Sequence, residues 1–173
     1  FTALLKAGVR GVKSPLTKGD RVQIMLHVDC GGDVEKTRWF FDQIVERDVP
    51  FDLIGLSYYP WWHGDIAGLR ENLAQTARRY GKPIVVVETG YPWRPHGETQ
   101  HMDWPMTPAG QRQFLLDLVE TVRATPDQLG RGVLWWYPEA IRTKGLAVWK
   151  NGDAALFDAE GHALPALQAL TPR

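Results

Sequence analysis

A single carboxylate, Glu88, stands at the end of an unbroken apolar run from Ile84 to Val87, and Gly90 and Pro92 follow it at once. A β-branched run bounded by proline and glycine predicts a strand that is buried on both faces. Parallel α/β sheets present their chemistry at the carboxyl ends of such strands. We therefore interpret Glu88 as a candidate functional carboxylate. The alternative is structural, with Glu88 solvated at the strand end or paired with a nearby arginine.

Polar and aromatic side chains also end the other three segments that are expected to form strands. They are His27 and Asp29; Ser57, Tyr58 and Tyr59; and Trp135, Trp136 and Tyr137, while Thr89 and Tyr91 accompany Glu88. Parallel strands end at the same edge of a sheet, so we expect these side chains to lie on one rim. Such a rim is typical of the catalytic face of a (β/α)8 barrel.

The elements that must position this rim alternate along the chain. Strands are expected over 21–29, 51–59, 84–88 and 132–137, and helices over 1–13, 34–47, 66–80, 108–124 and 164–170. Gly8 is expected to cap the first helix, and Thr107 to cap the helix that Pro108 begins. Trp61 to Gly64 are expected to form a loop. The alternation predicts parallel βαβ units, and four of them make half of a (β/α)8 barrel, an α/β fold that normally needs ~200 residues or more.

Composition excludes several classes of function. The 173 residues suit one domain, and a formal net charge of +0 argues against a nucleic-acid or anionic-membrane partner. No apolar run approaches the ~20 residues of a membrane span. Cys30 is the one cysteine, so no intrachain disulfide can form. No Gly-x-Gly-x-x-Gly follows the first strand, which lowers the expectation of nucleotide binding. The eight tryptophans suggest either flat apolar surface for a ligand or a large core.

Motifs spread over most of the chain resemble the endo-β-1,4-galactanases of glycoside hydrolase family 53. They are Met25-Leu26-His27-Val28-Asp29; Phe51 to Pro60 with Trp62; Lys82 to Thr89 with Tyr91-Pro92-Trp93; Thr107-Pro108 with Gly110-Gln111; and Ala155-Leu156-Phe157-Asp158. Their joint order and spacing carry the resemblance.

The resemblance implies a (β/α)8 TIM barrel of which strands 5–8 are present, so that residues 1–173 form the C-terminal half of one glycosidase catalytic domain. It implies a retaining hydrolase with Glu88 as its nucleophile. The family's acid/base lies in an Asn-Glu pair, and no such pair occurs here; Glu71 precedes Asn72, which is the wrong order, and Glu35, Glu46 and Glu98 have no preceding Asn. The chain begins at Phe1 rather than a methionine. We therefore expect an N-terminal half-barrel to be missing, and the isolated chain to turn over little.

The resemblance also implies a polysaccharide partner, β-1,4-galactan, and a secreted or periplasmic parent enzyme, although the sequence itself leaves the compartment undecided. The substrate-binding candidates are His27, Asp29, Ser57, Tyr58, Trp62, Tyr91 and Trp136. His27 and Asp29 have an alternative role as a structural hydrogen-bonded pair. Trp136 is expected to stack on a sugar ring rather than only close the core, because aromatic faces suit the apolar face of a pyranose.

Three details refine this site. Glu88 needs hydrogen-bond donors to stay ionised, and His27 is one candidate. Tyr58 and Tyr59 are the others, and of these two we expect Tyr58, because it lies at even spacing with Leu56 and Ile54. Family members usually have Trp-Glu-Pro where this chain has Trp136-Tyr137-Pro138, so another β-glycan substrate stays open, as does a non-catalytic sugar-binding role. Some bacterial members hold calcium in the loop after strand 7, but 94–106 has no Asp/Asn-rich run, and we expect neither metal nor cofactor.

Overall fold

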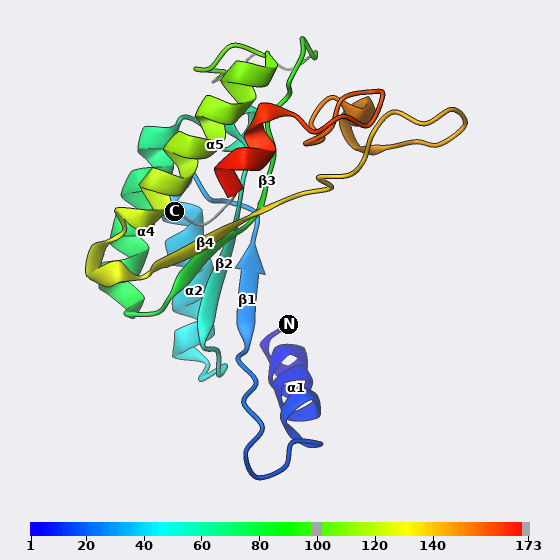
Figure 1. The fold of residues 1–173 in the computed structure, drawn as a ribbon. Helices are drawn as coiled ribbons and strands as arrows, with labels where there is room; N and C mark the ends of the chain where they lie inside the picture. Colours follow the sequence, from blue (N-terminus) through cyan, green and yellow to red (C-terminus); the bar gives the residue numbers. More distant parts are fainter. Residues whose placement is uncertain (98–101, 171–173) are drawn as a thin grey trace.

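Four parallel strands form one sheet in the computed structural model, which describes residues 1–97 and 102–170. The strands are β1 Met25–Val28, β2 Leu53–Tyr58, β3 Ile84–Thr89 and β4 Gly130–Trp135, and they lie side by side in that order (Figure 1). Consecutive parallel neighbours joined by crossover helices are the repeating pattern of a (β/α)8 barrel. The expected α/β fold, a partial barrel, is confirmed.

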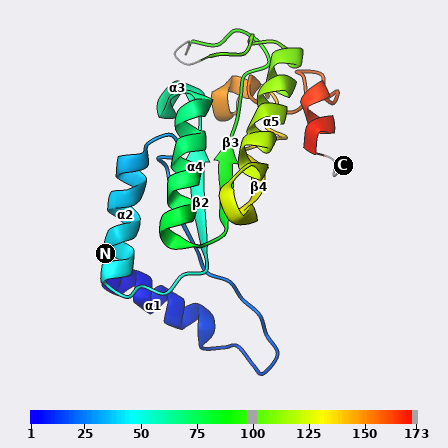
Figure 2. The same ribbon diagram turned by 90° about the vertical axis from the view of Figure 1, so that its left-hand side faces the viewer.

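The helices follow the strands in alternation. They are α1 Thr2–Lys13, α2 Val34–Glu46, α3 Pro60–His63, α4 Ile66–Tyr80 and α5 Pro108–Arg123, with 3-10 turns η1 Pro126–Gln128, η2 Trp149–Gly152 and η3 Pro165–Leu170. Figure 2 shows α2, α4 and α5 across one face of the sheet. We call the opposite face the open face. No helix in the described parts of the chain is long and apolar enough to cross a bilayer.

The core lies between the sheet and these helices. Ile54, Leu56 and Tyr58 of β2 have no exposed surface, and Leu69 of α4 and Phe114 of α5 pack in the same cluster, also without exposure. On β3, Ile84 and Val86 are buried, but Val85 and Val87 of the open face are only half-buried. The expectation that this strand is buried on both faces is therefore wrong for the described chain, because no helix covers the open face.

Several boundaries differ from those expected. Helix α1 runs through Gly8 to Lys13 and ends at Ser14, so the expected cap at Gly8 is wrong. The strand expected from 21 begins only at Met25, and 164–170 forms a 3-10 turn in place of an α-helix. The expected loop after Pro60 is the short helix α3. The expected cap at Thr107 is confirmed, since its hydroxyl accepts the N–H of Gly110 at 3.1 Å.

Candidate active site

Glu88 is directed onto the open face by an irregularity in β3. Leu56 of β2 pairs with Val86, but the next residue of β2, Ser57, pairs with Glu88, so β3 has one extra residue there. The pairing of β3 with β4 is also shifted between Val86 and Thr89. Such bulges re-aim side chains and are frequent beside active sites. Glu88 thus shares the face of Ser57, at the carboxyl end of the sheet, and its side chain is half-buried.

Tyr59 holds the carboxylate of Glu88. The Tyr59 hydroxyl donates a hydrogen bond of 2.9 Å to Glu88 Oε1, and its ring is 1% exposed. Burial raises the pKa of Tyr59 well above its ordinary value, and the hydrogen bond to Glu88 raises this pKa further. The phenol therefore keeps its proton at neutral pH and acts as a permanent donor to the carboxylate.

The expectation that Tyr58 is this donor is wrong. Successive residues of a strand alternate between faces, so Tyr58 shares the helix-covered face with Leu56, whereas Tyr59 shares the open face with Ser57. The Tyr58 ring stacks on Phe114, and its hydroxyl donates to the carbonyl of Gly64 at 3.0 Å. With no exposed surface, Tyr58 has no contact to offer a substrate in this structure.

Tyr91 is placed in the same way as Tyr58. It has no exposed surface, its ring stacks on Phe114 with centroids 4.7 Å apart, and its hydroxyl donates to the carbonyl of Trp104. Trp104 is itself 8% exposed. Tyr91 therefore packs the loop after β3 onto α5, and the interpretation of Tyr91 as a sugar contact has no geometric support.

His27 and Ser57 form a polar pair next to Glu88. His27 Nε2 and Ser57 Oγ are 2.7 Å apart, and Ser57 is the β2 neighbour of Glu88 across the sheet. His27 is exposed, while Ser57 is buried. This contact joins His27 to Ser57, in place of the hydrogen bond to Asp29 or to Glu88 that we considered. Three adjacent strands thus bring one polar group each to the open face.

Trp136 and Tyr137 extend the rim beyond β4. The backbone N–H of Trp136 donates to the Thr89 carbonyl at 2.8 Å, which anchors the backbone of Trp136 next to the residue that follows Glu88. The two rings contact each other edge to face, with centroids 4.7 Å apart, and they are 37% and 48% exposed. Tyr137 has a φ of 51°, a left-handed backbone that is uncommon for a residue with a side chain. The pair presents aromatic surface to solvent beside Glu88.

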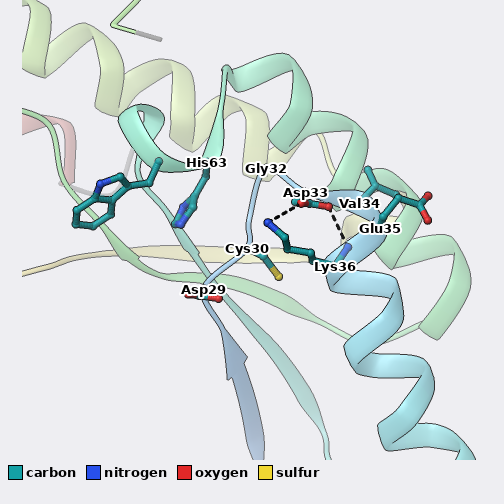
Figure 3. A pocket seen from close by; sticks show the side chains of 9 residues that line it. Asp29, Cys30, Gly32, Asp33, Val34, Glu35, Lys36 and His63 are labelled. Atoms are coloured by element: carbon teal, nitrogen blue, oxygen red, sulfur yellow. Dashed lines mark hydrogen bonds and ion pairs between the residues drawn. The ribbon is translucent and has the colours of Figure 1, made fainter. Parts of the chain in front are cut away.

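Asp29 and Trp62 lie on the other side of the site, where they line a pocket of about 580 Å³ together with His63 (Figure 3). Trp62 is 55% exposed. The N–H of Tyr59 donates to His63 Nδ1 at 3.0 Å, so Tyr59 supports both Glu88 and His63. Burial lowers the pKa of His63, and the carboxylates of Asp29 and Glu88 partly oppose this lowering.

One group of side chains in the described residues has the composition of a metal site. The ligand atoms of Asp158, Glu160 and His162 all lie within 4.8 Å of one another. Asp158 already accepts the N–H groups of Glu160 and His162, and its other oxygen contacts the His162 ring. These bonds account for the cluster as a turn in the chain, and we assign no metal to it.

Glycosyl hydrolase family 53 is the family whose model matches this chain, over residues 1–170. The chain belongs to this family. A Niallia circulans protein described as "Uncharacterized protein in bgaB 5'region" is 40% identical over 98% of the chain and 50% of its own length. The arabinogalactan endo-β-1,4-galactanase of Cellvibrio japonicus is 34% identical over 94% of the chain and 47% of its length.

Solved structures of family 53 share the fold. The Ignisphaera aggregans family 53 catalytic domain superposes with a TM-score of 0.86 at 27% identity, covering 97% of this chain and 50% of that one. The chain spans about half the length of the relatives it matches. The four parallel strands described above are therefore part of a family 53 barrel.

Sequence reasoning misses two residues of the candidate site. Tyr59 shares its strand parity with Ser57, and this signal identifies it as the residue that faces Glu88. His63 has no such signal, because nothing in the sequence shows that its ring accepts the Tyr59 N–H. Glu98, which we considered among the acid/base candidates, lies outside the described residues.

Proposed function

We propose that residues 1–173 form the second half of the barrel of a retaining endo-β-1,4-galactanase, in which Glu88 is the nucleophile. The observation that carries this proposal is the orientation of the Glu88 side chain. A bulge in β3 turns it onto the open face, and the Tyr59 hydroxyl donates to Glu88 Oε1 at 2.9 Å. The galactanase name of the Cellvibrio japonicus relative supports the substrate. The intact enzyme would cleave the galactan side chains of pectin.

A retaining mechanism needs two carboxyl groups about 5–5.5 Å apart, one to attack the anomeric carbon and one to protonate the leaving oxygen. Glu88 takes the first role. The second belongs to the part of the barrel that the chain's relatives have and residues 1–173 do not span. His27 and Ser57 lie where they can bond hydroxyls of the sugar under attack, and Trp136 can stack on its ring.

The test uses the full-length protein with Glu88→Ala, galactan oligosaccharides bearing a good leaving group, and sodium azide. The wild type should release products with retained β-configuration, followed by NMR of the anomeric proton. The variant should be inactive without azide. With azide it should give an α-glycosyl azide, because azide enters from the face that the carboxylate vacated. A β-configured azide, or unimpaired turnover, would place the nucleophile elsewhere.

A different β-linked glycan is the second candidate substrate. It is favoured by Tyr137, an exposed phenol that stands beside Trp136 where the family usually has a carboxylate. Comparing hydrolysis of galactan, mannan and β-glucan by the wild type and by Tyr137→Glu decides between the two. A variant that gains activity on galactan at the expense of another glycan would favour the second candidate. No hydrolysis of any β-glycan would support a non-catalytic sugar-binding role.

A further inference from the structure

Asp153 is the one charged side chain that is buried among the residues the structure describes, and it is 6% exposed. It lies in the connection that follows β4, and its two oxygens have separate partners in the loop that follows Glu88. Asp153 Oδ1 accepts from Arg94 Nε, and Oδ2 is 3.0 Å from His96 Nδ1. A carboxylate taken out of water needs such partners, and losing one of them is costly. Asp153 therefore links the β3–α5 loop to the chain that follows β4.

The backbone on either side of Asp153 adds to this link. The N–H of Trp93 donates to the Asp153 carbonyl at 2.9 Å, and the Trp93 indole N–H donates to the Gly152 carbonyl at 3.1 Å. The indole N–H of Trp135, the last residue of β4, donates to the carbonyl of Ala154 at 2.8 Å. These three successive residues of the connection therefore hold both the loop after β3 and the end of β4.

The turn that carries Asp153 has an unfavourable backbone. Lys150, Asn151 and Gly152 of η2 have φ of 48°, 54° and 84°. The left-handed region is uncommon for residues with a side chain, and it persists where surrounding contacts hold it. The shape of this turn therefore depends on its contacts with other segments, and the Asp153 carboxylate supplies two of them.

The same turn packs against Tyr59, the donor to the Glu88 carboxylate. The Tyr59 and Trp149 rings have centroids 5.9 Å apart, and Figure 2 shows the turn, in orange, beside α3. At Gly90 an added Cβ would lie 3.4 Å from the Tyr59 ring and 3.9 Å from the Ala154 Cβ, so the ring and the turn meet at this glycine. Two residues of the turn therefore help to fix the position of the Tyr59 ring.

We propose that Asp153 is a positioning residue for the nucleophile: its carboxylate holds the turn 149–154, and the turn keeps the Tyr59 hydroxyl on Glu88. The Asp153 carboxylate is buried and bonded to two side chains, so it has no contact of its own to offer a substrate. It acts through the orientation of Glu88, because an attacking group reacts fastest when it is already aligned with its target. This inference rests on the proposed role of Glu88.

The test compares Asp153→Asn with Asp42→Asn in the full-length protein. Asp42 is a matched control, because its carboxylate also accepts from an arginine, Arg79, and from a ring substituent, the Tyr80 hydroxyl, but on the outer helices α2 and α4. Each substitution is made in the wild type and in Tyr59→Phe. Steady-state kinetics on the β-glycan that the wild type cleaves give kcat and KM, at a temperature where circular dichroism shows every variant to be folded.

In the wild-type background Asp153→Asn should lower kcat about 3- to 10-fold, with a smaller change in KM, because a hydrogen bond to the attacking carboxylate is weakened. In the Tyr59→Phe background it should change kcat by less than about twofold, since the contact through which it acts is already gone. Asp42→Asn should leave kcat within about twofold in both backgrounds. Equal losses for Asp153→Asn in the two backgrounds, no loss in either, or losses matched by Asp42→Asn would overturn the proposal.

Two changes at Arg94 give the same test from the other side of the ion pair, and they decide the matter if Asp153→Asn does not fold. Arg94 is partly exposed, and its replacement leaves Asp153 in contact with His96. Arg94→Gln should lower kcat only where Tyr59 is present, whereas Arg94→Lys, which keeps the ion pair, should retain kcat. Equal effects of Gln and Lys, or a loss that does not depend on Tyr59, would make the link purely structural. Intact turnover in Glu88→Gln is a separate result, which would overturn the proposed function itself.

Discussion

The two ends of the same parallel sheet use charged side chains differently. At the amino end, the Asp52 carboxylate accepts the N–H of Ile24 at 2.7 Å, and the Lys82 ammonium donates to the Phe51 carbonyl at 2.8 Å. Lys82 also lies 4.6 Å from the centroid of the Phe51 ring. Both charges hold backbone groups of the segments that lead into β1 and β2. This end is built for stability, as is typical of the amino face of a barrel.

At the carboxyl end, side chains contact other side chains. Glu88 accepts from Tyr59, and His27 contacts Ser57, while Glu88 and His27 stay partly open to solvent. A charge at a strand end is therefore not functional by position alone. Glu88 and Asp52 differ in their partners. The half-buried carboxylate of Glu88 is held by the buried phenol of Tyr59, whereas the carboxylate of Asp52 accepts a backbone N–H.

The largest effect should come from removing the two carboxylate charges separately in the full-length protein. Glu88→Gln should lower kcat by about 10⁴- to 10⁶-fold, the scale seen for lost nucleophiles, while oligosaccharide binding persists. Asp52→Asn, the matched change at the other end of the sheet, should leave kcat within about twofold. Steady-state kinetics and calorimetry measure both. Comparable losses of kcat in the two variants would end the distinction between the two ends.

A smaller effect should separate the two adjacent tyrosines. Tyr59→Phe removes the donor to Glu88, and a hydrogen bond to a charged group contributes about 1.5–3 kcal/mol, so kcat should fall roughly 10- to 100-fold. Tyr58→Phe leaves the partly buried Gly64 carbonyl without its Tyr58 donor and should lower the free energy of unfolding by about 1–3 kcal/mol with little change in kcat. Kinetics and urea denaturation on both variants test this. A loss of kcat confined to Tyr58→Phe would reverse our assignment.

These tyrosines also show how far the sequence predicts the site. The apolar run before Glu88 and the alternation of strands and helices are local patterns, and they predict the parallel sheet and the position of Glu88 at its carboxyl end. The alternation of side chains along a strand also decides between Tyr58 and Tyr59, because the adjacent residues Ser57 and Tyr58 must point to opposite faces of the sheet. Of these two expected site residues, only Ser57 faces the side of Glu88. The barrel interior lies on the side of Ser57, not on the side of Ile54 and Leu56.

Other features have no local signal. The extra residue in β3 that turns Glu88 toward Ser57 arises from pairing with β2 and β4, which the sequence of β3 alone does not encode. The contact between the Tyr59 N–H and His63 depends on the turn that α3 makes after Pro60. Tyr91 comes three residues after Glu88 in the sequence, yet packing against Phe114 removes it from the rim. In each case tertiary contacts decide where the side chain goes.

The stabilising role of the amino end can be tested directly. Asp52→Ala removes the acceptor of the Ile24 N–H, which leads into β1. An unpaired, partly buried amide should lower the free energy of unfolding by about 1–3 kcal/mol. Urea denaturation measures this loss, and kcat at a temperature well below the transition should be unchanged. Unaltered stability would mean that water replaces the carboxylate and that this end tolerates the loss of its charge.

The smallest effect concerns pH and the carboxyl end. Because the folded state lowers the pKa of His63 below its ordinary value of 6.5, the unfolded chain takes up the proton more readily as the pH falls through that value. The stability that His63 contributes is therefore complete above about pH 7.5 and is lost as the pH falls through 6.5 toward the lowered pKa.

The variant His63→Asn has no group that titrates in this range. The free energy of unfolding of the wild type should decline more steeply than that of the variant between pH 7.5 and 5.5. The difference in slope should stay below about 1.4 kcal/mol per pH unit, the limit for one proton. Urea denaturation at several pH values measures both slopes. Parallel slopes would show that His63 titrates as in the unfolded chain, and a shallower wild-type slope would mean that Asp29 and Glu88 outweigh burial at this ring.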